Sequence, residues 1–385
     1  MWAIWLIDMS RPGPIDRLAK IKGTDFVHFY VLGSIARDGA WAEMYDMRAQ
    51  HARTLAIVSE RPEMVYLPIE SPQTALLMAS VATLPYTGAF TVWVAFIITT
   101  YVGCCWAMWR ECRALHTRRF EVVAACAAFP GLFSVVLHGQ TSFVALACVV
   151  VALIALRRGL RFVAGLALGL LVFKPHWLVA ACAVFVFARE WRVVAAAAVA
   201  ATAETAATFL CVGSSVMTVY VSALRALPKI ADLLEPRPGD SLKGLFRVLV
   251  AGDALPMALY AAAAVATLMI VAQVWRSDAA FEIRASAMVL AMILVSAHVN
   301  PYDLVLIAPV LFLTATWLEQ SREEHANTLF PPLLAALFFS PILVSLPAFV
   351  RLQFSVTAMA TLLVLMWRTT RRTVVADASF VSGHT

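Results

Sequence analysis

The sequence predicts an all-α fold, a polytopic bundle of transmembrane helices forming one domain over residues 1–385. Hydrophobic residues make up 62% of the chain and charged residues only 14%, and the mean hydropathy is +0.81. Soluble domains carry roughly 25% charged residues. The apolar runs lack the two-residue alternation of an outer-membrane barrel. Because a backbone in lipid must satisfy its own hydrogen bonds, these runs are expected to be helices.

The net charge of +6 does not indicate nucleic acid as a partner. A nucleic-acid surface needs one continuous basic face, whereas the arginines here cluster between apolar segments, where they signal membrane orientation. The seven cysteines show no zinc-ligand spacing. Glycine-loop, metalloprotease and serine-hydrolase motifs are missing as well. We therefore expect no metal and no cofactor, a divalent cation not being indicated, and we expect lipid-linked substrates.

The first residues, 1–7, are apolar but too short for a signal peptide or a membrane span. Pro12 and Pro14 then end any helix. We expect residues 1–9 either to belong to a first transmembrane helix or to touch only the membrane interface.

Residues 20–70 are expected to form a long first extracytoplasmic loop that carries interfacial helices. One short helix should begin near Phe26 and be closed by Gly39. The mixed pattern from Met44 to Ile57 is typical of an interfacial amphipathic helix.

Membrane segments are expected along the rest of the chain, at 72–86, 88–109, 121–137, 142–156, 160–173, 176–188, 193–213, 257–275, 284–299, 302–317, 329–347 and 352–367. Several are shorter than the ~20 residues that a full span needs. One continuous span through 160–188 would place Lys174 at mid-membrane. Two short helices that meet at Lys174-Pro175-His176 and line a protein cavity fit better.

Arginine clusters predict the orientation, since they favour the cytoplasmic side. They stand at Arg110 to Arg119, Arg157-Arg158-Arg161, Arg189-Arg192, Arg276 and Arg368-Arg371-Arg372. Counting helices then places the unusual polar groups on the opposite face, at His138-Gly139-Gln140, Lys174-Pro175-His176, a second extracytoplasmic loop over 214–256, and His298 to Asp303. Such a gathering is what a shared active site requires.

One conflict arises at the start of the bundle. If the loop 20–70 also lies outside, an odd number of crossings must separate it from Arg110, yet 72–86 and 88–109 make two segments. Either one segment is re-entrant or the loop that starts at Arg110 violates the charge rule.

Asp25 is the candidate catalytic base, because it lies between Gly23 and a run of aromatic residues close to the expected membrane surface. The alternative is a solvated loop carboxylate. We give that interpretation to most of the other acidic residues of the loop, which are Asp38, Glu43, Asp46, Glu60, Glu63 and Glu70.

Candidate substrate ligands interrupt the apolar helices, and ionisable groups at membrane depth are functional candidates. His298 is a candidate phosphate or substrate ligand, or alternatively a packed histidine, and Asp303 after Tyr302 can equally cap a helix. Lys174, with His176 two residues on, can bind a lipid phosphate or snorkel to the interface. Gln140 is a ligand or a helix-terminal hydrogen bonder.

A resemblance to a known family rests on an ordered series of short motifs. They are Asp25-Phe26 to Phe29-Tyr30, Gly39, Met44-Tyr45-Asp46, Tyr66-Leu67-Pro68 with Pro72, Leu84-Pro85-Tyr86 with Trp93, His138-Gly139-Gln140-Thr141, Ala164-Gly165-Leu166-Ala167-Leu168-Gly169, Lys174-Pro175, and His298 with Tyr302-Asp303. In order and spacing, over about residues 23–318, the sequence resembles glycosyltransferase family 87. These are polytopic enzymes of GT-C type that include mannosyltransferases of phosphatidylinositol mannosides.

The resemblance implies an inverting transfer of a hexose, with mannose expected, from a polyprenyl-phosphate sugar to a glycolipid or envelope glycan. The site would face the extracytoplasmic side of a bacterial inner membrane. By the same analogy Asp25 deprotonates the acceptor hydroxyl, His298 binds the donor phosphate or holds the acceptor, and Lys174 helps neutralise the leaving phosphate. The expected donor-binding set is completed by His176, Gln140, Tyr302 and Asp303.

Two other classes of function compete with this one. A transporter or flippase of lipid-linked sugars often shows two related halves with broken helices, but no repeat is visible and the polar groups collect on one side instead of near the midplane. A glycan ligase or polymerase with a lipid-pyrophosphate donor would favour a large basic outer loop, and the loop 214–256 is only moderately basic.

Overall fold

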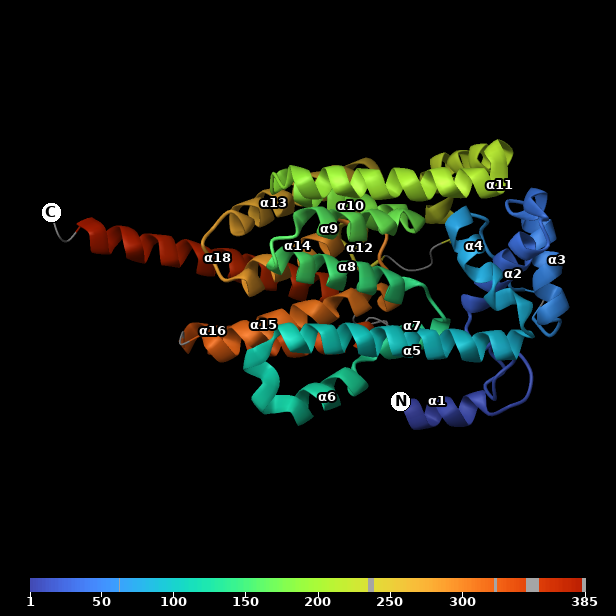
Figure 1. Ribbon diagram of the computed structural model, residues 1–385, viewed down its shortest axis with the longest axis horizontal. Coiled ribbons are helices and arrows are strands. Elements are labelled where there is room, and N and C mark those ends of the chain that lie inside the picture. Colours follow the sequence, from blue (N-terminus) through green and yellow to red (C-terminus); the bar gives the residue numbers. More distant parts are fainter. Residues whose placement is uncertain (62, 235–238, 322–323, 344–352, 383–385) are drawn as a thin grey trace.

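The computed structural model describes residues 1–61, 63–234, 239–321, 324–343 and 353–382. Within these ranges the chain is helical and holds no strand, only an isolated bridge between Ile15 and Ile21. The helices run mostly along the long axis of the molecule (Figure 1). The predicted all-α bundle is confirmed.

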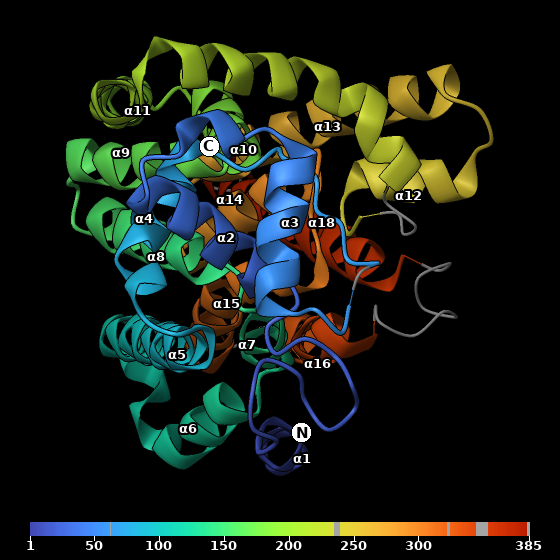
Figure 2. The ribbon, with the colours of Figure 1, turned by 90° about the vertical axis from the view of Figure 1, so that its right-hand side faces the viewer.

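Short elements precede the first long helix. They are α1 (Trp2–Met9), α2 (Phe26–Arg37), η1 (Trp41–Glu43), α3 (Met47–Ile57), α4 (Pro72–Ala79) and η2 (Val81–Thr83). The helix α1 lies on the flank of the bundle, where the Trp2 indole donates a hydrogen bond to the carbonyl oxygen of Ala127 (3.0 Å). The others form a cap over one end of the bundle, as the view onto that end shows (Figure 2).

Five helical stretches within the described residues are long and apolar enough to cross a membrane, so the chain is a membrane protein. They are α5 (Tyr86–Glu111); η3 (Arg113–Arg118) with α6 (Arg119–Ala128) and α7 (Pro130–His138); most of α11 (Trp191–Leu234); α13 (Ala254–Trp275); and η5 (Pro301–Ile307) with α15 (Ala308–Gln320). The remaining helices are α8 (Ser142–Arg157), α9 (Arg161–Gly169), η4 (Leu170–Phe173), α10 (Pro175–Phe187), α12 (Leu242–Leu249), α14 (Phe281–Val295), α16 (Glu324–Leu343) and α18 (Phe354–Ser382).

The core centres on α14, in which every residue from Ala285 to Val295 is buried. The chain breaks at Lys174 into two short helical arms, as predicted. Glycine brings the first arm against α11: a Cβ on Gly165 would lie 2.3 Å from the carbonyl oxygen of Val193. Close backbone approach of this kind is typical of helix packing in membranes.

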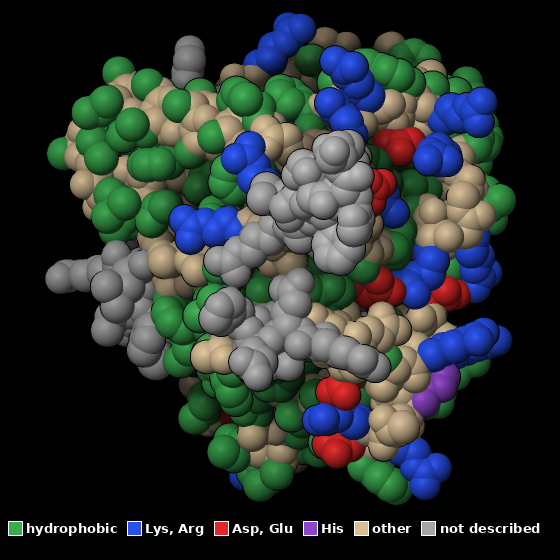
Figure 3. Space-filling model, turned by 90° about the vertical axis from the view of Figure 1, so that its left-hand side faces the viewer, with side chains coloured by type: hydrophobic (Ala, Val, Ile, Leu, Met, Phe, Trp, Pro, Cys, Tyr) green, Lys and Arg blue, Asp and Glu red, His purple; other side chains and the backbone are tan. Residues whose placement is uncertain are grey.

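The arginines between the apolar segments gather at one end of the bundle, called here the arginine end, and Figure 3 shows basic side chains on that face. Ion pairs join neighbouring helix termini there: Arg157 to Glu282 (2.7 Å), Arg161 to Glu190 (2.7 Å) and Arg118 to Glu319 (3.0 Å). The cap of α2, α3 and α4 lies at the opposite end (Figure 1).

Residues 72–86 are not one membrane segment, and this correction removes the conflict in the crossing count. They hold the eight-residue helix α4, the turn η2 and the start of α5. Eight residues rise only about 12 Å, far less than the ~30 Å of a bilayer core. Within the described chain one crossing, α5, separates the loop 20–70 from Arg110, so the two lie at opposite ends.

Two expected helices are also revised. The segment 121–137 is split into α6 and α7 at Pro130, whose ring nitrogen has no hydrogen to donate. The helix α3 begins at Met47, not Met44, because the carboxylate of Asp46 caps it by accepting from the N–H of Arg48 (2.8 Å). It buries Gln50 and Thr54, not an apolar face, so the amphipathic prediction for this helix is wrong.

The second outer loop is more helical than expected. The helix α11 continues past Gly213, whose positive φ of 83° bends it, and ends at Leu234. Figure 2 shows the part before this bend end-on at the upper left and the part after it crossing the top of the bundle toward α12. Much of the predicted loop 214–256 is therefore helix. Two expected segments extend beyond the described residues. These are 329–347, of which residues 344–347 are not described, and 352–367, of which residue 352 is not described.

An ion-pair network holds α3 onto α2. The Arg53 guanidinium bonds the carboxylates of Asp38 (2.8 Å) and Glu43 (2.6 Å) and donates to the Ser34 hydroxyl (3.2 Å). Hydrogen bonds from Arg53 and then Arg37 lower the pKa of Asp38. A lowered carboxyl pKa contributes stability above the unfolded value of about 4, and that contribution is lost as the pH falls through the folded value.

Replacing Arg53 with Met should loosen α3 and speed amide hydrogen exchange over residues 47–57 at pH 7. The exposed pairs are individually weak, so we expect a local effect and not global unfolding. In the unaltered protein, protection corrected for intrinsic rates should fall below about pH 4. Arg61→Met is the control, because Arg61 pairs with Glu63 inside its own turn (3.1 Å). Equal protection in both variants would contradict the assignment.

Candidate active site

Asp25 stands at the N-terminus of α2, but its carboxylate does not cap that helix. Its backbone N–H donates to the carbonyl oxygen of His138 (3.1 Å), and the Gln140 amide nitrogen donates to its Oδ2 (2.6 Å). These bonds join α2 to the junction of α7 and α8. Asp25 is half-buried, and among the described residues no hydrogen bond to its Oδ1 is found, so this oxygen can accept a hydrogen bond from a substrate.

Two glycines with positive φ make this junction possible. Gly23 and Gly139 both have a φ of 67°, a conformation that costs other residues roughly 1–2 kcal/mol. A Cβ on Gly139 would lie 2.5 Å from the Cβ of Phe26, and one on Gly23 would lie 2.4 Å from the Phe90 ring. The Trp93 indole also donates to the carbonyl oxygen of Gly139 (2.8 Å). The backbone that presents Asp25 and Gln140 is therefore fixed by packing.

Lys174 lies at the break before α10, with its side chain only 11% exposed, so it does not snorkel to the interface. Its Nζ donates to Ser142 Oγ (3.0 Å), Asp303 Oδ1 (3.3 Å) and Gln140 Oε1 (3.4 Å). It also lies 5.5 Å from the centre of the Tyr302 ring. Gln140 thus bridges the acid Asp25 and the cation Lys174.

Asp303 is both a helix cap and the partner of Lys174. Its Oδ2 accepts from the N–H of Asn300 (3.0 Å), completing a capping box at the start of η5. Its Oδ1 accepts from the Ser142 hydroxyl (2.6 Å) as well as from Lys174. The capping interpretation of Asp303 is confirmed, and its role in substrate binding stays a prediction.

His298, His176 and Tyr302 flank the cation. The Asn300 amide nitrogen lies 3.0 Å from His298 Nε2 and donates to the Tyr302 hydroxyl (2.6 Å). The rings of His176 and His298 meet edge to face, with their centres 5.8 Å apart. Asn300 was not among the predicted ligands, yet it fixes the orientation of two of them.

The structure brings all the predicted site residues into one cluster: Asp25, Gln140, Lys174, His176, His298, Tyr302 and Asp303. The cluster lies at the end opposite the arginines, where α7, α8, η4, α10, α14 and η5 begin or end. Within the part of the chain that the structure describes, no group of three or more His, Cys, Asp or Glu side chains is arranged to hold a metal ion.

The interpretation as a solvated loop carboxylate, given to most acidic residues of the loop, does not hold for Glu70. Burial raises its pKa, Lys174 and His298 lower it, and Asp25 and Asp303 raise it, so its carboxyl interacts with the charged residues of the cluster. The sequence feature that could have indicated this role for Glu70 is its position between Pro68 and Pro72, where the loop turns toward the membrane.

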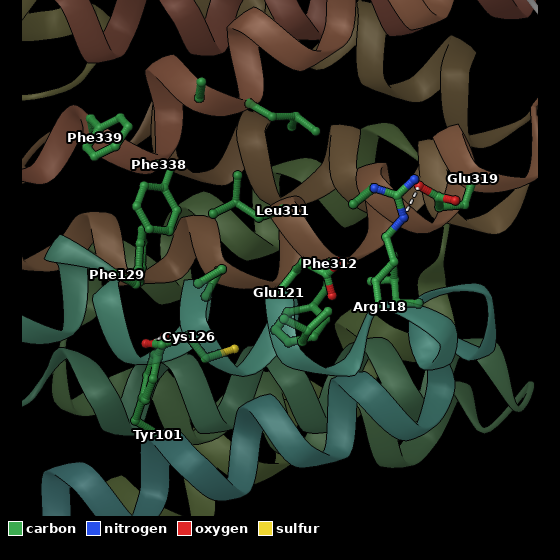
Figure 4. Close-up of a pocket in the computed structure, with 17 residues that line it drawn as sticks. Tyr101, Arg118, Glu121, Cys126, Phe129, Leu311, Phe312, Glu319, Phe338 and Phe339 are labelled. Carbon is green, nitrogen blue, oxygen red and sulfur yellow. Dashed lines mark hydrogen bonds and ion pairs between the residues drawn. The ribbon is translucent and has the colours of Figure 1, made fainter.

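The described cavities include two apolar ones beside α6, away from the cluster. One of about 420 Å³ lies between α6, α15 and α16 (Figure 4), and one of about 760 Å³ lies on the α5 side of α6. The first is lined mainly by aromatic and aliphatic side chains, with the Arg118–Glu319 ion pair at one end (3.0 Å). We assign no sugar chemistry to either cavity.

These features define a polytopic membrane protein with an acidic residue and a cation gathered at one end of its helices. The sequence model of glycosyltransferase family 87 matches residues 69–297, more than half of the chain. The chain therefore belongs to this family and is a glycosyltransferase. No curated protein and no solved structure matches it. The matched region contains Glu70, Gln140 and Lys174, while Asp25 lies before it and His298 directly after it.

Replacing Gly139 with Ala should lower the midpoint of thermal unfolding in detergent and reduce sugar transfer. Position 139 requires a positive φ, which alanine disfavours, and the added methyl group would collide with Phe26. Strain of this type costs about 1–3 kcal/mol. Gly103→Ala is the matched control, because Gly103 lies inside α5 with open space around it. A midpoint for the Gly139 variant equal to that of the control would show that the junction tolerates a side chain.

Proposed function

We propose that this glycosyltransferase transfers a hexose, with mannose expected, from a polyprenyl-phosphate donor to a hydroxyl of a glycolipid or envelope glycan, with inversion. The observation that carries the proposal is the path of hydrogen bonds from Asp25 through Gln140 to Lys174 (2.6 and 3.4 Å). It connects the proposed base to the cation within the cluster. Phosphate is a good leaving group, so base assistance and charge stabilisation are sufficient chemistry.

In the proposed reaction, the acceptor hydroxyl oxygen forms a bond to the anomeric carbon of the donor sugar. The bond between that carbon and the phosphate oxygen breaks, and its electron pair leaves with polyprenyl phosphate. Asp25 takes the hydroxyl proton. Lys174 and His298 stabilise the charge on the departing phosphate, and Asp303 with Ser142 holds Lys174 in place.

We propose further that transfer takes place on the extracytoplasmic face of a bacterial inner membrane. The support is the separation of charges: arginine-rich helix termini favour the cytoplasmic side, and the cluster lies at the other end of the same helices. A donor with a lipid tail can approach this end from within the bilayer.

Asp25→Asn should reduce transfer in membranes by about 10²–10⁴-fold, the usual contribution of a general base. Protein level and donor binding should stay close to normal, because Gln140 can still bond the amide oxygen. The measurement is incubation with a panel of radiolabelled prenyl-phosphate hexoses, followed by identification of the labelled lipid. Glu60→Gln, an exposed acidic residue of the same loop, is the control. Normal transfer by the Asp25→Asn variant would remove Asp25 from the mechanism.

Lys174 can be tested separately from its structural contribution. Lys174→Met leaves Asp303 as a buried, unpaired charge, which costs about 3–5 kcal/mol. The double variant Lys174→Met with Asp303→Asn removes both charges and keeps the acceptor for Ser142. We expect thermal stability to return in the double variant while transfer stays low. Recovery of transfer together with stability would show that Lys174 acts only in folding.

A further inference from the structure

The backbone of Glu70 is held on both sides. The Tyr45 hydroxyl donates to its carbonyl oxygen (3.1 Å), and the next residue, Ser71, caps α4 by accepting from the N–H of Thr74 (3.3 Å). The helix α4 packs along α2 and touches η4, the turn that leads to Lys174. The position of Glu70 above the cluster is therefore set by the fold.

The carboxyl of Glu70 interacts electrostatically with both the basic and the acidic residues of the cluster. It is within electrostatic range of Lys174 and His298, the cations, and of Asp25. Among the described residues no hydrogen bond to this carboxyl is found, although the carboxylate of Asp303 uses both of its oxygens. Glu70 thus offers hydrogen-bonding capacity that the described residues do not use.

The charge of the site indicates what Glu70 can bind. A carboxyl group repels a phosphate, so Glu70 is unsuited to the leaving group, for which Lys174 and His298 are the cations. The donor hexose would lie between the acceptor hydroxyl at Asp25 and the phosphate at Lys174. A carboxyl group that interacts with both of these residues is therefore expected near the hexose. Carboxyl oxygens bind pairs of sugar hydroxyls well. The stacked rings of Tyr45 and Tyr220, with centres 6.1 Å apart, add an aromatic surface next to it.

We propose that Glu70 binds hydroxyl groups of the hexose carried by the donor and thereby determines which hexose is transferred. This inference rests on the proposed function, since it names the part of the substrate that one more residue of the same site binds. Glu70 lies inside the region that matches the family, at its second residue.

The test combines Glu70→Ala with donors that each lack one sugar hydroxyl. In the unaltered enzyme, loss of the hydroxyl that Glu70 binds should lower kcat/KM for the donor about 10- to 100-fold, as expected for a hydrogen bond to a charged group. In Glu70→Ala the kcat/KM for the normal donor should fall by about the same factor. Removing that hydroxyl from the donor should then lower the kcat/KM of the variant only a little further. The KM for the acceptor should be unchanged. Glu70→Gln should recover part of the activity.

Glu63→Ala is the matched control, because Glu63 lies in the same loop with 58% of its side chain exposed. Unfolding midpoints in detergent identify any variant that fails to fold, and in that case Glu70→Gln carries the comparison with the deoxy donors. An equal loss with every donor, or a change confined to the acceptor KM, would overturn the inference while leaving the proposed function standing. Absence of transfer by the unaltered enzyme from every prenyl-phosphate hexose would overturn both.

Discussion

The buried ion pair between Lys174 and Asp303 is the interaction on which the candidate site depends. Removing two charges from water is expensive, and their attraction offsets the cost only when further hydrogen bonds satisfy both groups. Ser142 bonds both members of the pair, and the N–H of Asn300 occupies the remaining oxygen of Asp303. Satisfying this pair requires three helix termini, those of α8, α10 and η5, to meet at one point.

That meeting point explains why the chain interrupts its own helices. A continuous helix through Pro175 would carry Lys174 on a helical surface, remote from the helix termini that supply its partners. The break leaves its backbone at φ −121° and ψ 81°, outside the helical region, and aims its side chain at Asp303. Gln140, on the turn after Gly139, then extends the network to the carboxylate of Asp25. Hydrogen bonds thus connect four polar side chains inside an apolar bundle, in the order Asp25, Gln140, Lys174 and Asp303.

Much of this arrangement could be predicted from local features of the sequence. Apolar length and arginine placement predicted the bundle and its two ends, and the Lys174-Pro175 break was visible as a polar interruption. Glu70 could not be recognised in that way, because its environment is created by α4 and by helix termini far along the chain. The short span of α4 was likewise hidden, since the apolar pattern of residues 72–86 runs on through the helix end.

The limited length of the helices beneath the cluster affects how the protein sits in lipid. From the arginine end, α10 has 13 residues and α8 has 16, which rise only about 20 and 24 Å. A bilayer core of ~30 Å is thicker than that, and helices that are too short for it are accommodated by local thinning of the bilayer. In a bilayer that does not thin, the cluster would lie below the headgroup plane. Under the proposed function, the prenyl chain of the donor would then stay dissolved among the lipid chains during catalysis, avoiding the ~0.8 kcal/mol that each extracted methylene would cost. Turnover should accordingly respond to acyl-chain length in the host membrane.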